Sequence, residues 1–149
     1  MSANRTLKEK QSDFIDVVGL VLMAKSTRRI ALFRRGPKDI GAGHWEFPGG
    51  KVDDGESREQ ALVREINEEL QFKIDPIGLR FITKTLYVYP TKKIQLFLYL
   101  VTVADENITF CLSDHDHYEW VETEALQHVN FSPADLAMIP EVIEFVRNV

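Results

Sequence analysis

Residues 50–72, GKVDDGESREQALVREINEELQF, decide the fold of this chain. Ser57 and Gln60 have the Ser-x-x-Gln spacing of a capping box, which predicts a helix that begins there and continues to residue 70. Three apolar residues recur at the spacing of one helix face, namely Leu62, Ile66 and Leu70. We therefore expect this helix to pack against a sheet.

Three carboxylates lie together beside that apolar face. Glu65, Glu68 and Glu69 are three and four residues apart, and such residues are neighbours on a helix surface. Like charges this close destabilise a helix, and the single cation of Arg64 does not offset three of them. A hard divalent cation suits such a cluster, because Mg²⁺ takes one or two carboxylates together with substrate phosphates. The alternative interpretation is a solvated acidic helix face, which is common.

The residues upstream of the helix decide between these interpretations. Gly49 and Gly50 form a turn that lets the backbone approach an ion or a phosphate closely. With Glu56 and the run REINEELQF at residues 64–72, the stretch resembles the signature of the Nudix hydrolases. It differs from that signature only at Gln71, where the family has glycine. We expect either a left-handed Gln71 or a different helix end, with the site intact.

The resemblance implies a fold and a metal site. The fold is α/β, the Nudix αβα sandwich with a mixed β-sheet between helices, over roughly residues 14–147. Glu65 and Glu69 would bind Mg²⁺, or Mn²⁺, directly, and Glu68 would be a ligand or support one. The carbonyl of Gly49 would be a further ligand. The metal would polarise the phosphorus and lower the pKa of the attacking water.

The resemblance also implies roles around the metal. Arg64 and Glu56 would orient the carboxylates. The reaction needs a general base. Glu65 is one candidate, and Glu119, just before Trp120, is the other, because MutT-type relatives have a catalytic or metal-binding glutamate there. Clustered carboxylates titrate as a group, so both candidates stay open.

Residues 45–51, WEFPGGK, resemble the MutT-like branch of the family, which includes enzymes that cleave nucleoside triphosphates to monophosphate and pyrophosphate. In this branch Arg35 would bind phosphate, although a surface charge at a strand end is the alternative. Glu46, Phe47 and Lys51 would line the substrate site.

Asp135 occupies the position of the branch's base-recognition residue. Relatives that cleave 8-oxo-dGTP have Asn there, whereas CTP-type relatives have Asp. An ionised Asp accepts hydrogen bonds only. Oxidised or normal dGTP and (d)CTP all remain open, and Asp135 could instead be an acid in the first turn of the last helix.

The resemblance thus implies Mg²⁺-dependent cleavage of a nucleoside triphosphate to monophosphate and pyrophosphate, which would sanitise the nucleotide pool. Other activities are alternatives to this one. An RNA 5′-pyrophosphohydrolase is one, although the low basic content disfavours it. A nucleotide-sugar or dinucleotide hydrolase is another. A non-catalytic Nudix ligand sensor is disfavoured because the chain retains Glu65, Glu68 and Glu69.

The rest of the chain reads as one domain at residues 13–149 after a flexible arm at residues 1–12. The predicted strands cover residues 14–25, 29–34, 45–47, 79–89, 93–104, 108–112 and 118–121. We expect Pro48 and the two glycines to end the third strand. A short helix is predicted at residues 123–128, and Ser132-Pro133 begins a last helix that Pro140 kinks or divides.

Composition limits the classes of function. The chain has 149 residues, 44% of them apolar, and a net charge of −5. Such an acidic chain is a poor non-specific binder of nucleic acids, so we expect no stable nucleic-acid partner. Cys111 is the only cysteine, which excludes an internal disulfide. Residues 14–24 are too short to span a bilayer, and no signal peptide is evident, so we expect a cytoplasmic monomer or homodimer with no membrane association.

The run Asp114-His115-Asp116-His117 is a weaker signal. Two histidines at alternate positions of a strand would share a face and could bind zinc. We expect instead that the run lies in a polar turn.

Overall fold

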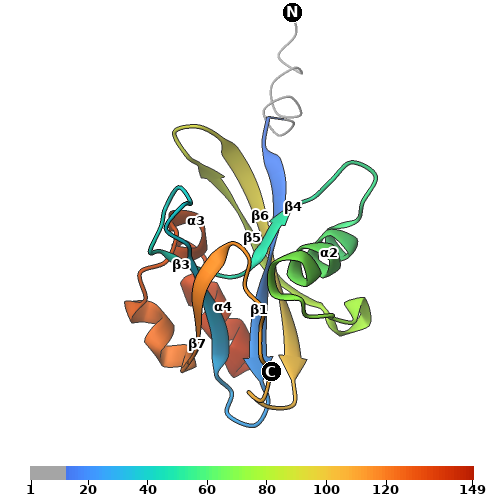
Figure 1. The fold of residues 1–149 in the computed structure, drawn as a ribbon, viewed down its shortest axis with the longest axis vertical. Coiled ribbons are helices and arrows are strands. Elements are labelled where there is room, and N and C mark those ends of the chain that lie inside the picture. Colours follow the sequence, from blue (N-terminus) through green and yellow to red (C-terminus); the bar gives the residue numbers. More distant parts are fainter. Residues whose placement is uncertain (1–12) are drawn as a thin grey trace, which may run out of the picture.

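A seven-stranded mixed sheet forms the centre of the fold in the computed structural model, which describes residues 13–149 (Figure 1). The arm predicted at residues 1–12 lies outside the described residues. The strands are β1 (Ile15–Ala24), β2 (Ile30–Arg35), β3 (Trp45–Glu46), β4 (Gly49–Lys51), β5 (Arg80–Val88), β6 (Lys93–Val103) and β7 (His115–Val121).

Strand β1 is the central strand. The order is β3-β2-β1-β6-β5, with β4 also paired to β1 and β7 also paired to β2. The long β1–β6 pairing is parallel, whereas the β1–β2 and β5–β6 hairpins are antiparallel. Since β1 has strand neighbours on both sides, its backbone polar groups are paired. Its residues from Val18 onward are buried, because both faces of the sheet are covered.

Helices cover both faces of the sheet. They are α2 (Arg58–Leu70), α3 (Pro133–Leu136) and α4 (Ile139–Arg147), with 3₁₀ turns η2 (Pro76–Gly78) and η3 (Thr123–His128). Helix α2 lies on one face, and α3 and α4 lie on the other (Figure 1). The αβα sandwich is therefore confirmed. Pro140 lies in the first turn of α4, so the predicted last helix is divided in two.

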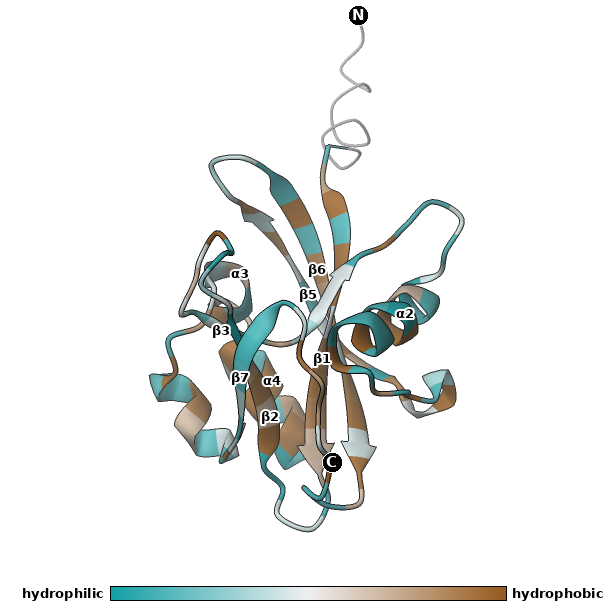
Figure 2. Cartoon of the chain, viewed as in Figure 1, coloured by the Kyte–Doolittle hydropathy of each residue, from teal (hydrophilic) through white to brown (hydrophobic). Residues whose placement is uncertain are grey.

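The core has two layers because β1 alternates between them. Leu20 and Leu22 pack with the apolar face of α2, whereas Val21 and Met23 pack with α4. Figure 2 shows the central strands as hydrophobic over much of their length and the loops as hydrophilic. None of the helices within residues 13–149 is long and apolar enough to cross a membrane.

Helix α2 begins and ends as its sequence predicted. The Ser57 hydroxyl accepts a hydrogen bond from the Gln60 amide at 3.1 Å, and the Gln60 side chain accepts one from the Ser57 amide at 2.8 Å. Gln71 follows the helix in the left-handed conformation, with φ 52° and ψ 41°. Position 71, where the Nudix signature has glycine, therefore has the left-handed backbone that glycine favours, although the residue is Gln71.

Two predictions about strands were wrong. Residues 108–112 form no strand. Instead, the Cys111 and Ser113 amides donate to the carbonyls of Leu70 and Glu69, which satisfies the C-terminal end of α2. The third strand ends before Pro48, as predicted, but Gly49 and Gly50, which were expected to form a turn, form β4 against β1.

Candidate active site

The two glycines of β4 let α2 approach the sheet closely. The Gly49 amide donates to a carboxylate oxygen of Glu69 at 3.0 Å. A Cβ atom on Gly50 would lie 2.4 Å from Cδ of Glu65, and one on Gly49 would lie 1.9 Å from the carbonyl oxygen of Val18. Gly49 is therefore required by a contact with the backbone, whereas a side chain at Gly50 would displace the Glu65 carboxylate, and two of the predicted metal ligands are positioned against β4.

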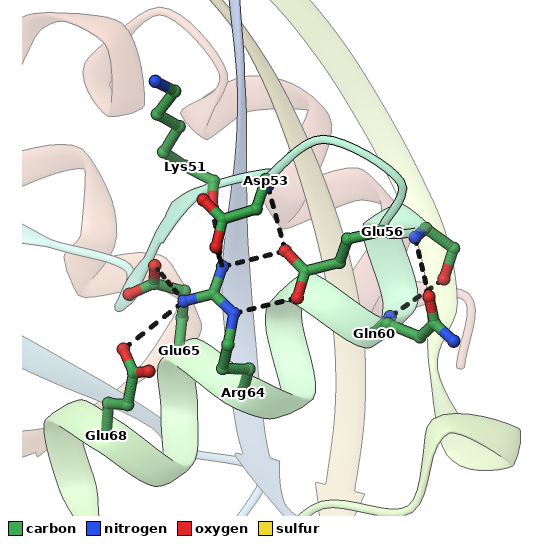
Figure 3. Close-up of polar contacts among 8 residues, drawn as sticks. Lys51, Asp53, Glu56, Gln60, Arg64, Glu65 and Glu68 are labelled. Carbon is green, nitrogen blue, oxygen red and sulfur yellow. Dashed lines mark hydrogen bonds and ion pairs between the residues drawn. The ribbon is translucent and has the colours of Figure 1, made fainter.

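Arg64 connects the loop before α2 to the carboxylates of the helix (Figure 3). Its guanidinium forms two hydrogen bonds of 2.8 Å with Glu56, in a fork-to-fork arrangement. It also donates to Glu65 at 2.9 Å, to Glu68 at 3.4 Å and to the carbonyl of Lys51 at 3.0 Å. These contacts give Arg64 and Glu56 the geometry that their predicted orienting role requires.

The bond to Arg64 and the bond from the Asp53 amide lower the pKa of Glu56 to about 2. The carboxylate is thereby kept ionised. The same bond to Glu56 fixes the Arg64 guanidinium and raises its pKa.

Glu69 lies in a different electrostatic environment. Burial, followed by repulsion from Glu46 and Glu65, raises its pKa to about 9 despite the bond from the Gly49 amide. Burial also raises the pKa of Glu65, against the opposing effect of Arg64. The cluster therefore has more carboxylates than its one nearby guanidinium can neutralise.

The donors fit a hard divalent cation. Carboxylate oxygens that lack compensating charge are the ligands Mg²⁺ prefers. Within residues 13–149, no three His, Cys, Asp or Glu side chains already form a group able to hold a metal ion. Glu65 and Glu68 are instead engaged by Arg64. A cation would therefore have to compete with Arg64 for these two side chains, and substrate phosphates would supply further oxygens.

A second group of residues lies beside the cluster, on β2, β3 and β7. Glu46 accepts a hydrogen bond from Nε2 of His115 at 2.9 Å, and its other oxygen lies 3.4 Å from Nη1 of Arg35. The charge of Glu46 raises the pKa of both Glu69 and Asp135. Glu46 thus lies between the carboxylates of α2 and the predicted base-recognition residue.

Asp135 is buried in the first turn of α3. It accepts a hydrogen bond from the Phe47 amide at 3.2 Å, so it links α3 to the β3–β4 connection. Burial, with a smaller contribution from Glu46, raises its pKa well above the ordinary value. A neutral carboxyl at this position can both donate and accept a hydrogen bond.

Strand β4, the α2 carboxylates and the Arg64 network together form the arrangement that the Nudix resemblance implied, and the comparison with known proteins agrees. The sequence profile described as the NUDIX domain matches residues 13–142. The chain belongs to the Nudix family. As a Nudix hydrolase, it is an enzyme that acts on acid anhydrides.

Relatives of this Nudix hydrolase have named activities. The chain is 39% identical over 105 residues to the 8-oxo-dGTP diphosphatase of Haemophilus influenzae, which covers 69% of this chain and 73% of the relative. It is 29% identical to the CTP pyrophosphohydrolase of Escherichia coli, over 84% of this chain and 88% of that one. The solution structure of the E. coli ORF135 protein superposes with a TM-score of 0.73 at 28% identity, over 89% of this chain and 91% of that one.

Two predicted residues of the Nudix site have side chains outside the Arg64 network. Glu119 is on β7, is largely exposed and lies 3.3 Å from Nε2 of His117. The Lys51 side chain extends away from Arg64 (Figure 3), although its carbonyl belongs to the Arg64 network.

His115 is a residue near the Nudix site that the sequence pattern did not identify. The run at residues 114–117 was predicted as a turn, which was wrong, because β7 begins at His115. The alternative, two histidines on one strand face, is not found either. The His115 side chain is 2% exposed and contacts Phe33, whereas the His117 side chain is 49% exposed and contacts Trp45.

Proposed function

We propose that this Nudix hydrolase cleaves a nucleoside triphosphate to a nucleoside monophosphate and pyrophosphate in a Mg²⁺-dependent reaction, and that it sanitises the nucleotide pool. One observation carries the proposal. The Glu65 carboxylate lies against Gly50, is held by Arg64, and is flanked by the buried Glu69. Nudix hydrolases generally use divalent metals, and this arrangement provides an oxygen-rich, negatively charged site for one.

The residues divide the work between chemistry and binding. Glu65, Glu68 and Glu69 would hold the cation, with Arg64 keeping the first two on one side of the helix. When bound, Mg²⁺ would neutralise charge on the phosphates and make the phosphorus more electrophilic. Arg35 would bind a phosphate from the β2 side of the site, next to Glu46.

We place 8-oxo-dGTP first among the substrates. A relative named for this activity, from Haemophilus influenzae, shares 39% identity. A neutral Asp135 would present one donor and one acceptor, which is the hydrogen-bonding capacity of the Asn found in relatives that cleave 8-oxo-dGTP. The base would lie next to the Phe47 backbone, whose amide Asp135 already binds.

A (d)CTP substrate is the second candidate. The CTP pyrophosphohydrolase of E. coli matches over a larger share of this chain, although at lower identity. If nucleotide binding ionises Asp135, its carboxylate would accept from the amino group of cytosine. The two candidate substrates therefore require different protonation states of Asp135.

The test is a panel of 8-oxo-dGTP, the four dNTPs, CTP, a nucleotide sugar and a dinucleoside tetraphosphate, each assayed with Mg²⁺ for pyrophosphate and orthophosphate. We expect the highest kcat/KM with 8-oxo-dGTP and release of pyrophosphate. Release of orthophosphate, or turnover of none of the triphosphates, would contradict the proposal. For Asp135→Asn, which cannot ionise, we expect the kcat/KM for CTP to fall further below that for 8-oxo-dGTP, and an unchanged ratio of the two would show that Asp135 does not read the base.

A further inference from the structure

We propose that His115 is a positioning residue of this enzyme, holding Glu46 and, through it, the phosphate-binding Arg35 in the geometry that receives the nucleotide. The inference rests on the proposed function for the identity of the ligand. The contacts themselves do not depend on that proposal.

The contact pattern gives Glu46 two neighbours with separate tasks. One carboxylate oxygen accepts from Nε2 of His115 at 2.9 Å, and the other faces Nη1 of Arg35 at 3.4 Å. Because the two oxygens of a carboxylate are rigidly connected, a donor fixed on one of them sets the direction of the other. His115 thereby orients the oxygen that faces Arg35.

The fixed position of His115 comes from an irregularity in β7. Arg34 pairs with His117 and Arg35 pairs with His115, so Asp116 is an extra residue, which makes a β-bulge. A bulge reverses the alternation of side chains along a strand. His115 consequently turns away from the face of His117 and lies against the Phe33 ring, 5.6 Å between centroids.

The bulge is held in place by contacts with the two neighbours of Arg35. The Gly36 amide, which follows Arg35, donates to the carbonyl of Asp114 at 3.1 Å. The Arg34 side chain binds Asp116 at 2.8 Å on the exposed side. Backbone and side-chain contacts on both sides of His115 therefore keep its ring directed at Glu46.

The hydrogen-bonding state of the ring supports a specific role. A carboxylate accepts, so Nε2 of His115 carries the hydrogen. Within residues 13–149, only two buried side-chain nitrogens lack a hydrogen-bond partner, namely Nδ1 of His115 and Nε of Arg35. Buried polar groups are usually paired, so these two atoms mark a site not satisfied by the protein alone. Nε of Arg35 belongs to the group that a phosphate would bind.

The kinetic test compares variants that keep or remove the donor. His115→Phe preserves an aromatic ring next to Phe33 but removes Nε2–H. His115→Gln supplies an amide donor at a similar distance. We expect His115→Phe to raise KM for 8-oxo-dGTP about tenfold with kcat changed less than twofold, and His115→Gln to restore most of the affinity. His128→Phe, at an exposed position in η3, is the control and should leave KM unchanged.

A double-mutant cycle with Glu46→Gln separates positioning from a general loss of structure. If His115 acts through Glu46, His115→Phe adds little to the KM of the Glu46→Gln variant. An unchanged KM in His115→Phe, or equal effects of that substitution in both backgrounds, would overturn the proposal.

A spectroscopic measurement does not depend on turnover. In the folded wild-type protein labelled with ¹⁵N-histidine, we expect hydrogen on Nε2 of His115, protected from exchange, and loss of this protection in Glu46→Ala, which removes the acceptor. Hydrogen on Nδ1 alone would overturn the positioning role even if the enzyme is active. If the wild type hydrolyses no triphosphate, the proposed function fails, and the spectrum still decides whether His115 holds Glu46.

Discussion

Single residues of this site are defined by close approach and burial. Gly50 has no space for a side chain because Glu65 occupies it, and Asp135 has no solvent to stabilise its charge. Both conditions predict measurable consequences of substitution.

Gly50→Ala should impair catalysis more than folding. The new Cβ atom would lie 2.4 Å from Cδ of Glu65, and that carboxylate is the far end of a flexible chain that can move aside. A displacement of about 1 Å in a reacting group can cost ~100-fold in rate. We expect kcat to fall by about that factor while Tm, from circular dichroism, changes little.

Gly78→Ala is the control for this substitution, because its Cβ atom would meet only Cγ2 of Val101 at 3.5 Å, an ordinary contact. It should retain wild-type kcat. If Gly50→Ala also retained kcat within twofold, the contact between Gly50 and Glu65 would have no part in catalysis.

Asp135→Asn should stabilise the protein at neutral pH. The folded-state pKa of Asp135 is raised above its ordinary value of 3.8, mainly by burial. The stability that the protonated form contributes is full below pH 3.8 and is lost as the pH rises towards the folded-state pKa. Asn has no such loss and can still accept from the Phe47 amide.

Thermal unfolding measured from pH 3.5 to pH 8 tests this prediction. The Tm of Asp135→Asn should exceed that of the wild type at pH 8, and the difference should shrink on acidification. Asp54→Asn, at an exposed position, should show no such pH dependence. If the Tm difference between Asp135→Asn and the wild type stayed constant with pH, the raised pKa of the buried Asp135 would be contradicted.

At the scale of elements, helix α2 combines a strong beginning with a strained end. Its capping box satisfies the first turn, whereas Gln71 takes the left-handed backbone that favours glycine. The strain lies outside the carboxylate cluster, so stability can be changed there without changing the site.

Gln71→Gly should raise the stability of the protein by about 1 kcal/mol, because glycine avoids the cost of the left-handed conformation. For a domain of this size, that corresponds to a Tm increase of about 2–4 °C. Gln71→Ala removes the same side chain and keeps the Cβ atom, so it should give no increase. Equal Tm values for the two variants would show that backbone strain at Gln71 is negligible.

Elements with strong local signals could be predicted from the sequence, and those set by tertiary contacts could not. The capping residues and the apolar spacing of residues 57–70 predict helix α2. Strand β4 carries the Gly49-Gly50 pair, which suggests a turn, and it extends only because β1 offers a partner. Residues 108–112 alternate like a strand, but the amides of Cys111 and of the following Ser113 bind the end of α2 instead.

The candidate site divides in the same way. The clustering of Arg64, Glu65 and Glu69 could be predicted directly, since a helix places such residues together. The part of Glu56, which precedes the helix, followed only from the resemblance to the Nudix signature. The role of His115 could not be predicted, because it depends on a bulge at Asp116 that no local preference indicates.

For the whole molecule, the negative charge of the site should link metal binding to stability. Mg²⁺ that binds only the folded state raises the free energy of unfolding, by about 2.7 kcal/mol at a hundred times its Kd. We expect the Tm to rise with MgCl₂ concentration beyond the rise in NaCl of matched ionic strength. Glu65→Gln should reduce this rise. Identical curves in the two salts would indicate that the folded chain alone has no Mg²⁺ site.

The central claim is that the α2 carboxylates are an active pyrophosphohydrolase site, and the kcat of Glu65→Gln tests it most directly. The measurement is pyrophosphate release from 8-oxo-dGTP with saturating Mg²⁺, together with the Tm of the same sample. Glu59→Gln, the same change on the same helix beside Tyr99, is the control. We predict a kcat at least ~100-fold below wild type for Glu65→Gln, with wild-type values for the control and a Tm that shows intact folding. A Glu65→Gln enzyme that kept kcat within threefold of wild type would contradict the account.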